Sequence, residues 1–261
     1  MSFGRVLLIG NSHLAAPRNA LRDWPERWPD FRPDIFGLPG RGIGELELRD
    51  GVLLSDDPEI RRQINFYNEV PALAVTGYDA FVVVGGSSFA QLCSVQTSHR
   101  SLGFPSVAAG IPCELCSEGF MDAMVRRRIL ASTAMRLIRR LARLGIAPIL
   151  FLPAPLPSVE CRDDPQQEQA LLQLFRRGDG ASFHQRYLHH LHELMSDLAV
   201  VIEQPPDTMV HEVFTRSEWM RGSLRLNSRQ DVQHGRAEYS HGNTRFGARR
   251  IDQILAGLQA L

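Results

Sequence analysis

The chain has 261 residues, 44% of them hydrophobic, which is enough for one sizeable core in a single domain over residues 1–261. Its 29 acidic and 29 basic residues balance, so no chain-wide field favours nucleic acid or a membrane surface. The sequence contains no lysine. A P-loop of the GxxxxGK[ST] type and Schiff-base chemistry with pyridoxal phosphate are therefore excluded. No apolar run approaches the roughly 20 residues of a membrane span and no signal-peptide pattern is present, so we expect a cytoplasmic protein.

In chain order, five short apolar segments are predicted to be buried strands. They cover residues 5–10, 33–40, 79–86, 147–153 and 199–204. Helical patterns alternate with these segments. The first helix is predicted to begin at about Leu14. The others cover Phe120–Leu144, about Gln166–Arg177, about Ser182–Leu198 and about Thr244–Leu261. After the second strand, the stretch ELELRDGVLLS alternates on both sides of Asp50-Gly51, which predicts a small hairpin insertion.

Short, nearly uninterrupted apolar strands separated by helices predict a parallel sheet that is covered on both faces. The fold class is therefore α/β, a three-layer α/β/α sandwich with a five-stranded parallel sheet. Ligands of such folds bind beyond the carboxyl ends of the strands. Three of the five predicted strand ends are small, polar or rich in glycine, as a site that needs close backbone approach requires.

One set of residues at these strand ends has the chemistry of nucleophilic catalysis. Ser12 follows the first strand at the start of a helix, where a serine is either a simple helix cap or a nucleophile. His241, at the start of the last helix, is the best candidate for its base, and Glu238 lies three residues earlier, where it can orient the imidazole. The backbone N–H groups of Ser12 and Gly40 are candidates for an oxyanion hole, to which Ser87 adds a hydroxyl.

These blocks resemble the SGNH (GDSL-like) hydrolases. IGNSH is similar to the Gly-Asp-Ser start of that family, and FGLPGRG is similar to its second block, with Gly40 at the oxyanion position. VVVGGSS stands at the place of the third block, and EYSHGN stands at the place of the Asp-x-x-His block. The blocks occur in the family's order over nearly the whole chain. The resemblance implies a flavodoxin-like α/β/α fold and hydrolysis or transfer of acyl groups on lipids, carbohydrates and other small esters, with neither a cofactor nor a metal.

Three positions depart from the family pattern. Asn11 replaces the aspartate beside the serine, Glu238 replaces the aspartate of the triad, and Ser87 stands at the oxyanion asparagine. Loss of an oxyanion donor costs about 3–4 kcal/mol of transition-state stabilisation, so the change at Ser87 bears most on activity. Asp207 and Asp231 compete with Glu238 as partners of the histidine.

Other motifs favour ordinary roles. Cys113 and Cys116 form a single CxxC, which is two ligands short of a structural zinc site. Gly40, Gly42 and Gly44 form GxGxG after a strand, but no helix follows, so a dinucleotide site is excluded.

Histidines and arginines gather on two predicted helices. The histidine cluster contains His184, His189, His190 and His192. It is interpreted as a solvated helix face, and the arginines between positions 126 and 143 as a soluble surface, because no aromatic residues for base stacking are interleaved. No metal and no nucleic acid are therefore expected as partners.

Two functions from different classes follow. The first is a serine-dependent hydrolase or O-acyltransferase acting on a small ester or an acylated carbohydrate, selected by the loops Pro153–Pro165 and Gln204–Ser240, with Trp219 as a stacking surface. The second is a non-catalytic carbohydrate- or partner-binding domain on the same fold. His13 is assigned no role.

Overall fold

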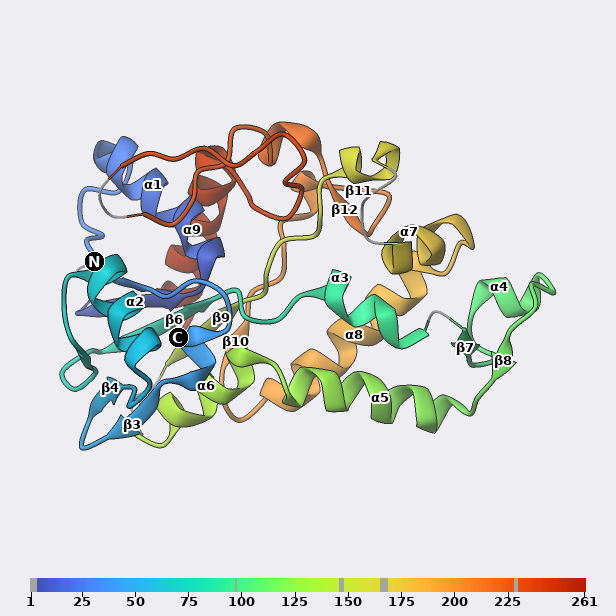
Figure 1. Ribbon diagram of the computed structural model, residues 1–261, viewed down its shortest axis with the longest axis horizontal. Coiled ribbons are helices and arrows are strands. Elements are labelled where there is room, and N and C mark those ends of the chain that lie inside the picture. Colours follow the sequence, from blue (N-terminus) through green and yellow to red (C-terminus); the bar gives the residue numbers. More distant parts are fainter. Residues whose placement is uncertain (1–3, 97, 146–147, 165–168, 228–229) are drawn as a thin grey trace.

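The centre of the molecule is a five-stranded sheet in which every neighbouring pair is parallel. The computed structural model describes residues 4–96, 98–145, 148–164, 169–227 and 230–261. The strands are β1 (Val6–Gly10), β2 (Asp34–Gly37), β6 (Ala80–Val84), β9 (Ile149–Leu152) and β10 (Val200–Val201). Their order across the sheet is β10-β9-β6-β1-β2 (Figure 1). The α/β class and the parallel sheet are thereby confirmed, and the strand order reverses between β1 and β6, where such folds bind ligands.

Helices cover both faces of the sheet, because alternate strand side chains enter two separate apolar clusters. Val6 and Leu8 face the cluster formed with α1 (Ala15–Asp23) and α9 (Thr244–Gln259). Leu7 and Ile9 face the larger cluster on the other side. The helices of that side are α2 (Pro58–Asn68), α5 (Glu118–Leu130), α6 (Thr133–Ala142) and α8 (Gly180–Met195). This arrangement is compatible with a three-layer sandwich.

The predicted hairpin insertion is confirmed. Strands β3 (Glu47–Arg49) and β4 (Val52–Leu54) pair antiparallel, and the short β5 (Leu73–Ala74) extends them. Asp50 and Gly51 at the turn have φ values of 49° and 77°, the left-handed region that a two-residue hairpin turn requires.

A distal lobe extends from one end of the sheet (Figure 1). We use this name for α5 and α8, which run side by side, together with the short elements between and beside them. These are α3 (Phe89–Leu92), β7 (His99–Arg100), α4 (Pro105–Ala108), β8 (Glu114–Leu115) and α7 (Gln169–Arg176). Its buried side chains belong to the same apolar cluster as Leu7 and Ile9, so the lobe shares a core with the sheet.

The prediction of one helix over Phe120–Leu144 is wrong. The segment forms two helices, and Ser132 caps the second by accepting a hydrogen bond from the Met135 N–H. Serine is a preferred N-cap, so this break had a local signal. Phe120, the first residue of the predicted helix, is 51% exposed.

The segment from Gln204 to Ser240 crosses the carboxyl edge of the sheet on its way to α9. Its described residues contain the antiparallel pair β11 (Met209–Val210) with β12 (Phe214–Thr215), an isolated antiparallel bridge between Leu224 and Gln233, and two short 3-10 helices among turns. Residues 165–168 of the expected helix from Gln166 lie outside the described residues. None of the described helices is long and apolar enough to cross a membrane.

Candidate active site

Ser12 lies immediately beyond the carboxyl end of β1, in a short 3-10 turn that leads into α1. The Asn11 side chain caps this turn by accepting a hydrogen bond from the His13 N–H at 3.2 Å. The Asn11 N–H donates to the carbonyl of Val84 in β6 at 3.2 Å. Asn11 therefore ties the turn to the neighbouring strand and fixes the position of Ser12 at the switch point of the sheet.

His241 is positioned by the start of α9. Asn243 caps this helix by accepting from the Phe246 N–H, and its side-chain amide donates to the carbonyls of Glu218 and Arg221. The helix itself packs very closely on α1, since a Cβ placed on Gly247 would lie 2.0 Å from the Ala16 carbonyl oxygen. This close approach brings the residues before α9 next to Ser12.

The structure brings Ser12, His241 and Glu238 into one hydrogen-bonded chain. His241 Nε2 lies 2.8 Å from Ser12 Oγ, and His241 Nδ1 lies 3.1 Å from Glu238 Oε1. An ionised carboxylate can only accept, so Nδ1 carries the proton and Nε2 accepts from the Ser12 hydroxyl. This is the geometry in which a serine is activated as a nucleophile.

Glu238 is held as a carboxylate by its neighbours. Its side chain accepts from the N–H of Ser240 at 2.8 Å and from the Ser240 hydroxyl. The hydrogen bond with His241, followed by those from Ser240, lowers the pKa of Glu238 well below its usual range, although burial acts in the opposite direction. The charge needed to orient and stabilise a protonated His241 is therefore in place.

Two further histidines contact the ring of His241. The ring centroid of His13 lies 4.6 Å from that of His241, and the ring centroid of His234 lies 4.3 Å from it. The interplanar angles are 24° and 15°, so both rings are stacked. Burial is the main cause that lowers the pKa of His13 to about 3 and that of His234 to about 4. Both rings are neutral at pH 7.

This stack could not be predicted from the sequence. The sequence predicts no role for His13, although it is the residue after Ser12. His234 lies in the long segment before α9, where no helix or strand periodicity predicts which side chains turn inward. The contact depends on tertiary structure alone.

The two remaining candidates for the oxyanion hole lie at the same edge of the sheet. Gly40 follows β2 with a φ of 64°, and the Leu38 N–H donates to the Gly10 carbonyl, which fastens this segment to the end of β1. Ser87 follows β6, is 8% exposed, and its hydroxyl lies 3.2 Å from the hydroxyl of Tyr187 in α8. The roles of both residues in binding an oxyanion stay predictions.

The competing carboxylates are engaged elsewhere. Asp207 pairs with Arg249 in α9 at 2.9 Å, and Asp231 pairs with Arg22 in α1 at 2.6 Å. Each acid is more than half exposed. Among the described residues, Glu238 is the carboxylate that reaches His241.

Comparison with protein-family models and with curated proteins finds no match. What the site does is therefore inferred from its residues and geometry.

The site is poorly suited to a metal ion, although His234, Glu238 and His241 bring three donor atoms within 4.8 Å of one another. A metal lies in the plane of each imidazole that binds it, whereas the rings of His234 and His241 are stacked face to face. Both nitrogens of His241 are also already used by Ser12 and Glu238.

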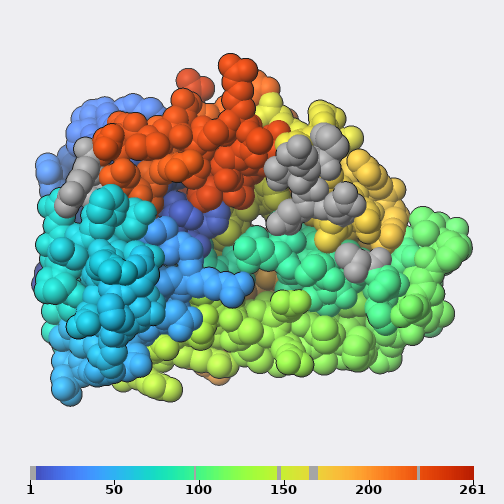
Figure 2. Space-filling view, viewed as in Figure 1, coloured from blue at the N-terminus to red at the C-terminus, as the bar shows by residue number. Residues whose placement is uncertain are grey.

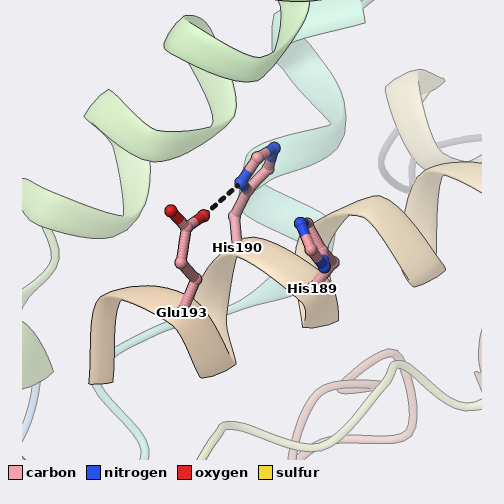
Figure 3. A group of neighbouring side chains, drawn as sticks. All are labelled: His189, His190 and Glu193. Carbon is pink, nitrogen blue, oxygen red and sulfur yellow. Dashed lines mark hydrogen bonds and ion pairs between the residues drawn. The ribbon is translucent and has the colours of Figure 1, made fainter. Parts of the chain in front are cut away.

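The histidine cluster on α8 contains a second group of possible ligands (Figure 3). His190 contacts Glu193 at 3.3 Å and Asp122 of α5 at 2.9 Å, while His189 is exposed. The expectation of a solvated face is wrong for His190, which is 6% exposed. Its ring links α5 to α8, so it is explained by packing between these helices.

A cavity of about 210 Å3 lies beside the candidate catalytic residues. His13, Glu238 and Ser240 form part of its wall, together with Ser88 and with Leu171 of α7. The surface is hollowed between the segment before α9, orange in Figure 2, and the teal segment that follows β6. Ligand sites for drug-sized molecules are usually about 300–1,000 Å3, so this cavity fits only a small group.

Proposed function

We propose that the chain is a serine-dependent acyl-ester hydrolase or O-acyltransferase of the SGNH type, acting on a small ester or an acylated carbohydrate. The observation that carries this proposal is the hydrogen-bonded chain from Ser12 through His241 to Glu238. It joins residues more than 220 positions apart at the switch point of a parallel sheet. Two cavities of about 210 and 610 Å3 border Glu238 and leave room for a small ester or an acylated sugar. A cytoplasmic location stays a prediction.

In the proposed reaction, Ser12 Oγ attacks the acyl carbonyl and its proton passes to His241 Nε2. Glu238 holds the Nδ1–H and stabilises the imidazolium that forms. The tetrahedral oxyanion is bound by the N–H groups of Ser12 and Gly40 and by the Ser87 hydroxyl. When this intermediate collapses, His241 returns the proton to the departing alcohol and an acyl ester remains on Ser12.

The second half of the reaction releases Ser12. A water molecule, or the hydroxyl of an acceptor, gives its proton to His241 and attacks the acyl carbonyl. The Ser12 oxygen leaves and recovers the proton from Nε2. Water yields the free acid and an acceptor alcohol yields a new ester, so the same residues serve a hydrolase and a transferase. This chemistry requires no cofactor.

The bond between Ser87 and Tyr187 bears on the oxyanion hole. Burial raises the pKa of Tyr187 to about 12, so its hydroxyl keeps its proton and can donate to Ser87. The Ser87 proton is then available for an oxyanion. If Ser87 donates to Tyr187 instead, one donor is lost, which favours the second candidate, a carbohydrate- or partner-binding domain without catalysis.

A fluorophosphonate probe tests the proposal. We expect it to form a covalent bond with Ser12 of the wild type, located by mass spectrometry of the digested protein. Ser12→Ala and His241→Ala should not be labelled, since the first lacks the nucleophile and the second its base. Ser196→Ala, at an unrelated surface serine, is the control. Equal labelling of the wild type and Ser12→Ala, or no labelling of either, would contradict the assignment.

A further inference from the structure

An unusual feature of the site is that the ring of His241 is stacked against two other histidine rings. The ring centroid of His13 lies 4.6 Å from that of His241, and the ring centroid of His234 lies 4.3 Å from it. His13 belongs to the turn after β1, and His234 to the segment that crosses the sheet edge. Two distant parts of the chain thus place the same type of ring against one imidazole.

Hydrogen bonds do not account for these two rings. The buried His13 Nδ1 and His234 Nε2 have no hydrogen-bond partner among the described residues. An unsatisfied buried polar atom costs about 1–3 kcal/mol, so an apolar side chain would be more stable here. Such a cost at two positions that contact the same ring calls for a functional explanation.

The backbone leaves room for the His13 ring. Gly85, just beyond β6, has a φ of 76°, and a Cβ on this residue would lie 2.9 Å from His13 Cδ2 and 2.1 Å from Asn11 Oδ1. The glycine therefore allows the His13 ring and the Asn11 cap to occupy their positions above the sheet edge.

We propose that His13 and His234 are positioning residues, whose neutral rings stack against the imidazole of His241 so that it remains aligned with Ser12 and Glu238. This inference rests on the proposed function, since it assigns His241 the role of the base. A stacked ring restricts rotation of His241 and covers its face from water. Its electron-rich face also stabilises the imidazolium that forms during the reaction.

The charges around the stack are compatible with this role. Protonated His241 lowers the pKa of both neighbouring histidines, Glu238 raises them, and Arg225 lowers that of His234 further. Burial exceeds these effects and keeps both rings uncharged above pH 5. His241 therefore takes up a proton without meeting a second cation in the stack.

We test the inference by replacing His234. Its ring borders a cavity of about 610 Å3, so a larger phenylalanine ring can replace it without overpacking. We expect His234→Ala to lower kcat on a p-nitrophenyl ester on the order of 10-fold to 100-fold, since misplacement by about 1 Å can cost about 100-fold. KM should change little. His234→Phe, which restores a flat ring, should recover most of the loss, and the control His189→Ala on α8 should match the wild type.

The pH profile separates positioning from a merely structural role. Above pH 5, the acid limb of kcat/KM should follow a single proton in the wild type, because burial lowers the pKa of His13 to about 3 and that of His234 to about 4. A limb that follows two protons contradicts the inference. So does a kcat of His234→Ala equal to the wild type, or a His234→Phe variant as slow as His234→Ala.

An NMR measurement makes the inference independent of activity. In Ser12→Ala, the ring protons of His241 should shift downfield when His234 is replaced by alanine, because the ring current of the stacked neighbour is lost. Unchanged shifts refute the stack. If the shifts change but the wild type is not labelled by the fluorophosphonate, the stack stands and the proposed hydrolase function fails.

Discussion

Among the described residues, His241 contacts five other side chains of the site, and Ser240 Oγ lies 3.2 Å from Nδ1, beside Glu238. Ser12 lies at Nε2, Glu238 at Nδ1, and His13 and His234 stack on the ring. Because an imidazole can rotate about two side-chain bonds, two hydrogen bonds and two stacked rings together fix one orientation. Under the proposed function, the base is therefore aligned before a substrate binds, and such alignment is a first requirement for general base catalysis.

Replacement of Glu238 tests the acid of the triad. Glu238→Gln keeps the shape of the side chain but removes its charge, so the imidazolium of His241 is no longer stabilised. We expect kcat to fall by up to about 10,000-fold, with the fold unchanged in circular dichroism. Glu238→Asp should lose less. Glu218→Gln, at an exposed acid of the same segment, is the control. A Glu238→Gln variant with the wild-type kcat would exclude this residue from the triad.

The buried histidines predict how stability depends on pH. Burial lowers the pKa of His184 to about 4, against about 6.5 in an unfolded chain. Between these values the unfolded state binds a proton that the folded state does not, so stability falls as the pH decreases from about 6.5 to about 4. Each such group contributes a slope of up to about 1.4 kcal/mol per pH unit.

Urea unfolding at several pH values checks this slope. His184 contacts the rings of Phe89 and Tyr187, so His184→Phe keeps an aromatic ring in place while it removes the titrating group. We expect its free energy of unfolding to decline less steeply than that of the wild type between pH 6.5 and 4. The exposed His189→Phe should follow the wild-type curve. Parallel curves for all three proteins would contradict the prediction.

At the scale of elements, the site depends on how closely α1 and α9 pack. A Cβ on Gly247 would lie 2.0 Å from the Ala16 carbonyl oxygen and 2.7 Å from the Pro17 nitrogen. Both are backbone atoms and cannot move away without displacing α1. Since Ser12 precedes α1 and His241 precedes α9, the separation of these two helices sets the distance between Ser12 and His241.

Gly247→Ala should therefore lower both the melting temperature and the rate of labelling at Ser12. Gly257→Ala in the same helix is a matched control, because its Cβ would meet only the ends of the Ile202 and Leu150 side chains, at 3.0 and 3.1 Å. Alanine favours a helix by about 1 kcal/mol over glycine, so the control should keep or gain stability. If both variants label Ser12 at the wild-type rate, close packing does not position the site.

Local patterns predicted the elements better than they predicted the contacts between them. The apolar runs predicted all five strands of the sheet, and Asp50-Gly51 predicted the hairpin. Each of these elements is determined by the residues within it. The break at Ser132 was missed since apolar periodicity outweighed a single capping residue. The burial of His190 required knowledge that α5 lies against α8.

The candidate site divides in the same way. Ser12 and His241 are adjacent to elements that the sequence predicts, and Glu238 is only three residues from His241, so their meeting could be expected. His234 comes from a segment with little regular structure, and its position depends on how that segment crosses the sheet edge. Residues of this kind are visible only in three dimensions.

At the scale of the whole molecule, the distal lobe and the sheet share one apolar cluster. Phe104 and Phe183 of the lobe belong to the same group of buried side chains as Leu7 and Phe81 of the sheet. A continuous core predicts cooperative unfolding, in which damage to the lobe lowers the stability of the entire chain. A single unfolding transition would support the prediction that residues 1–261 form one domain.

A substitution of Asp179 tests whether the lobe and the sheet unfold together, because Asp179 is fully buried in the lobe, immediately before α8. Its carboxylate accepts from the N–H and the hydroxyl of Ser106 at 2.8 and 2.6 Å, and Arg100 lies 3.9 Å away. Asp179→Asn leaves the Arg100 charge buried beside a neutral amide. Breaking a buried pair in this way costs about 3–5 kcal/mol. Calorimetry should show one transition at a lower temperature, with the exposed Asp197→Asn as control. A separate transition at lower temperature that leaves labelling at Ser12 intact would contradict the prediction. It would mean that the lobe unfolds alone, because its contacts with the sheet are too weak to couple the unfolding of the two parts.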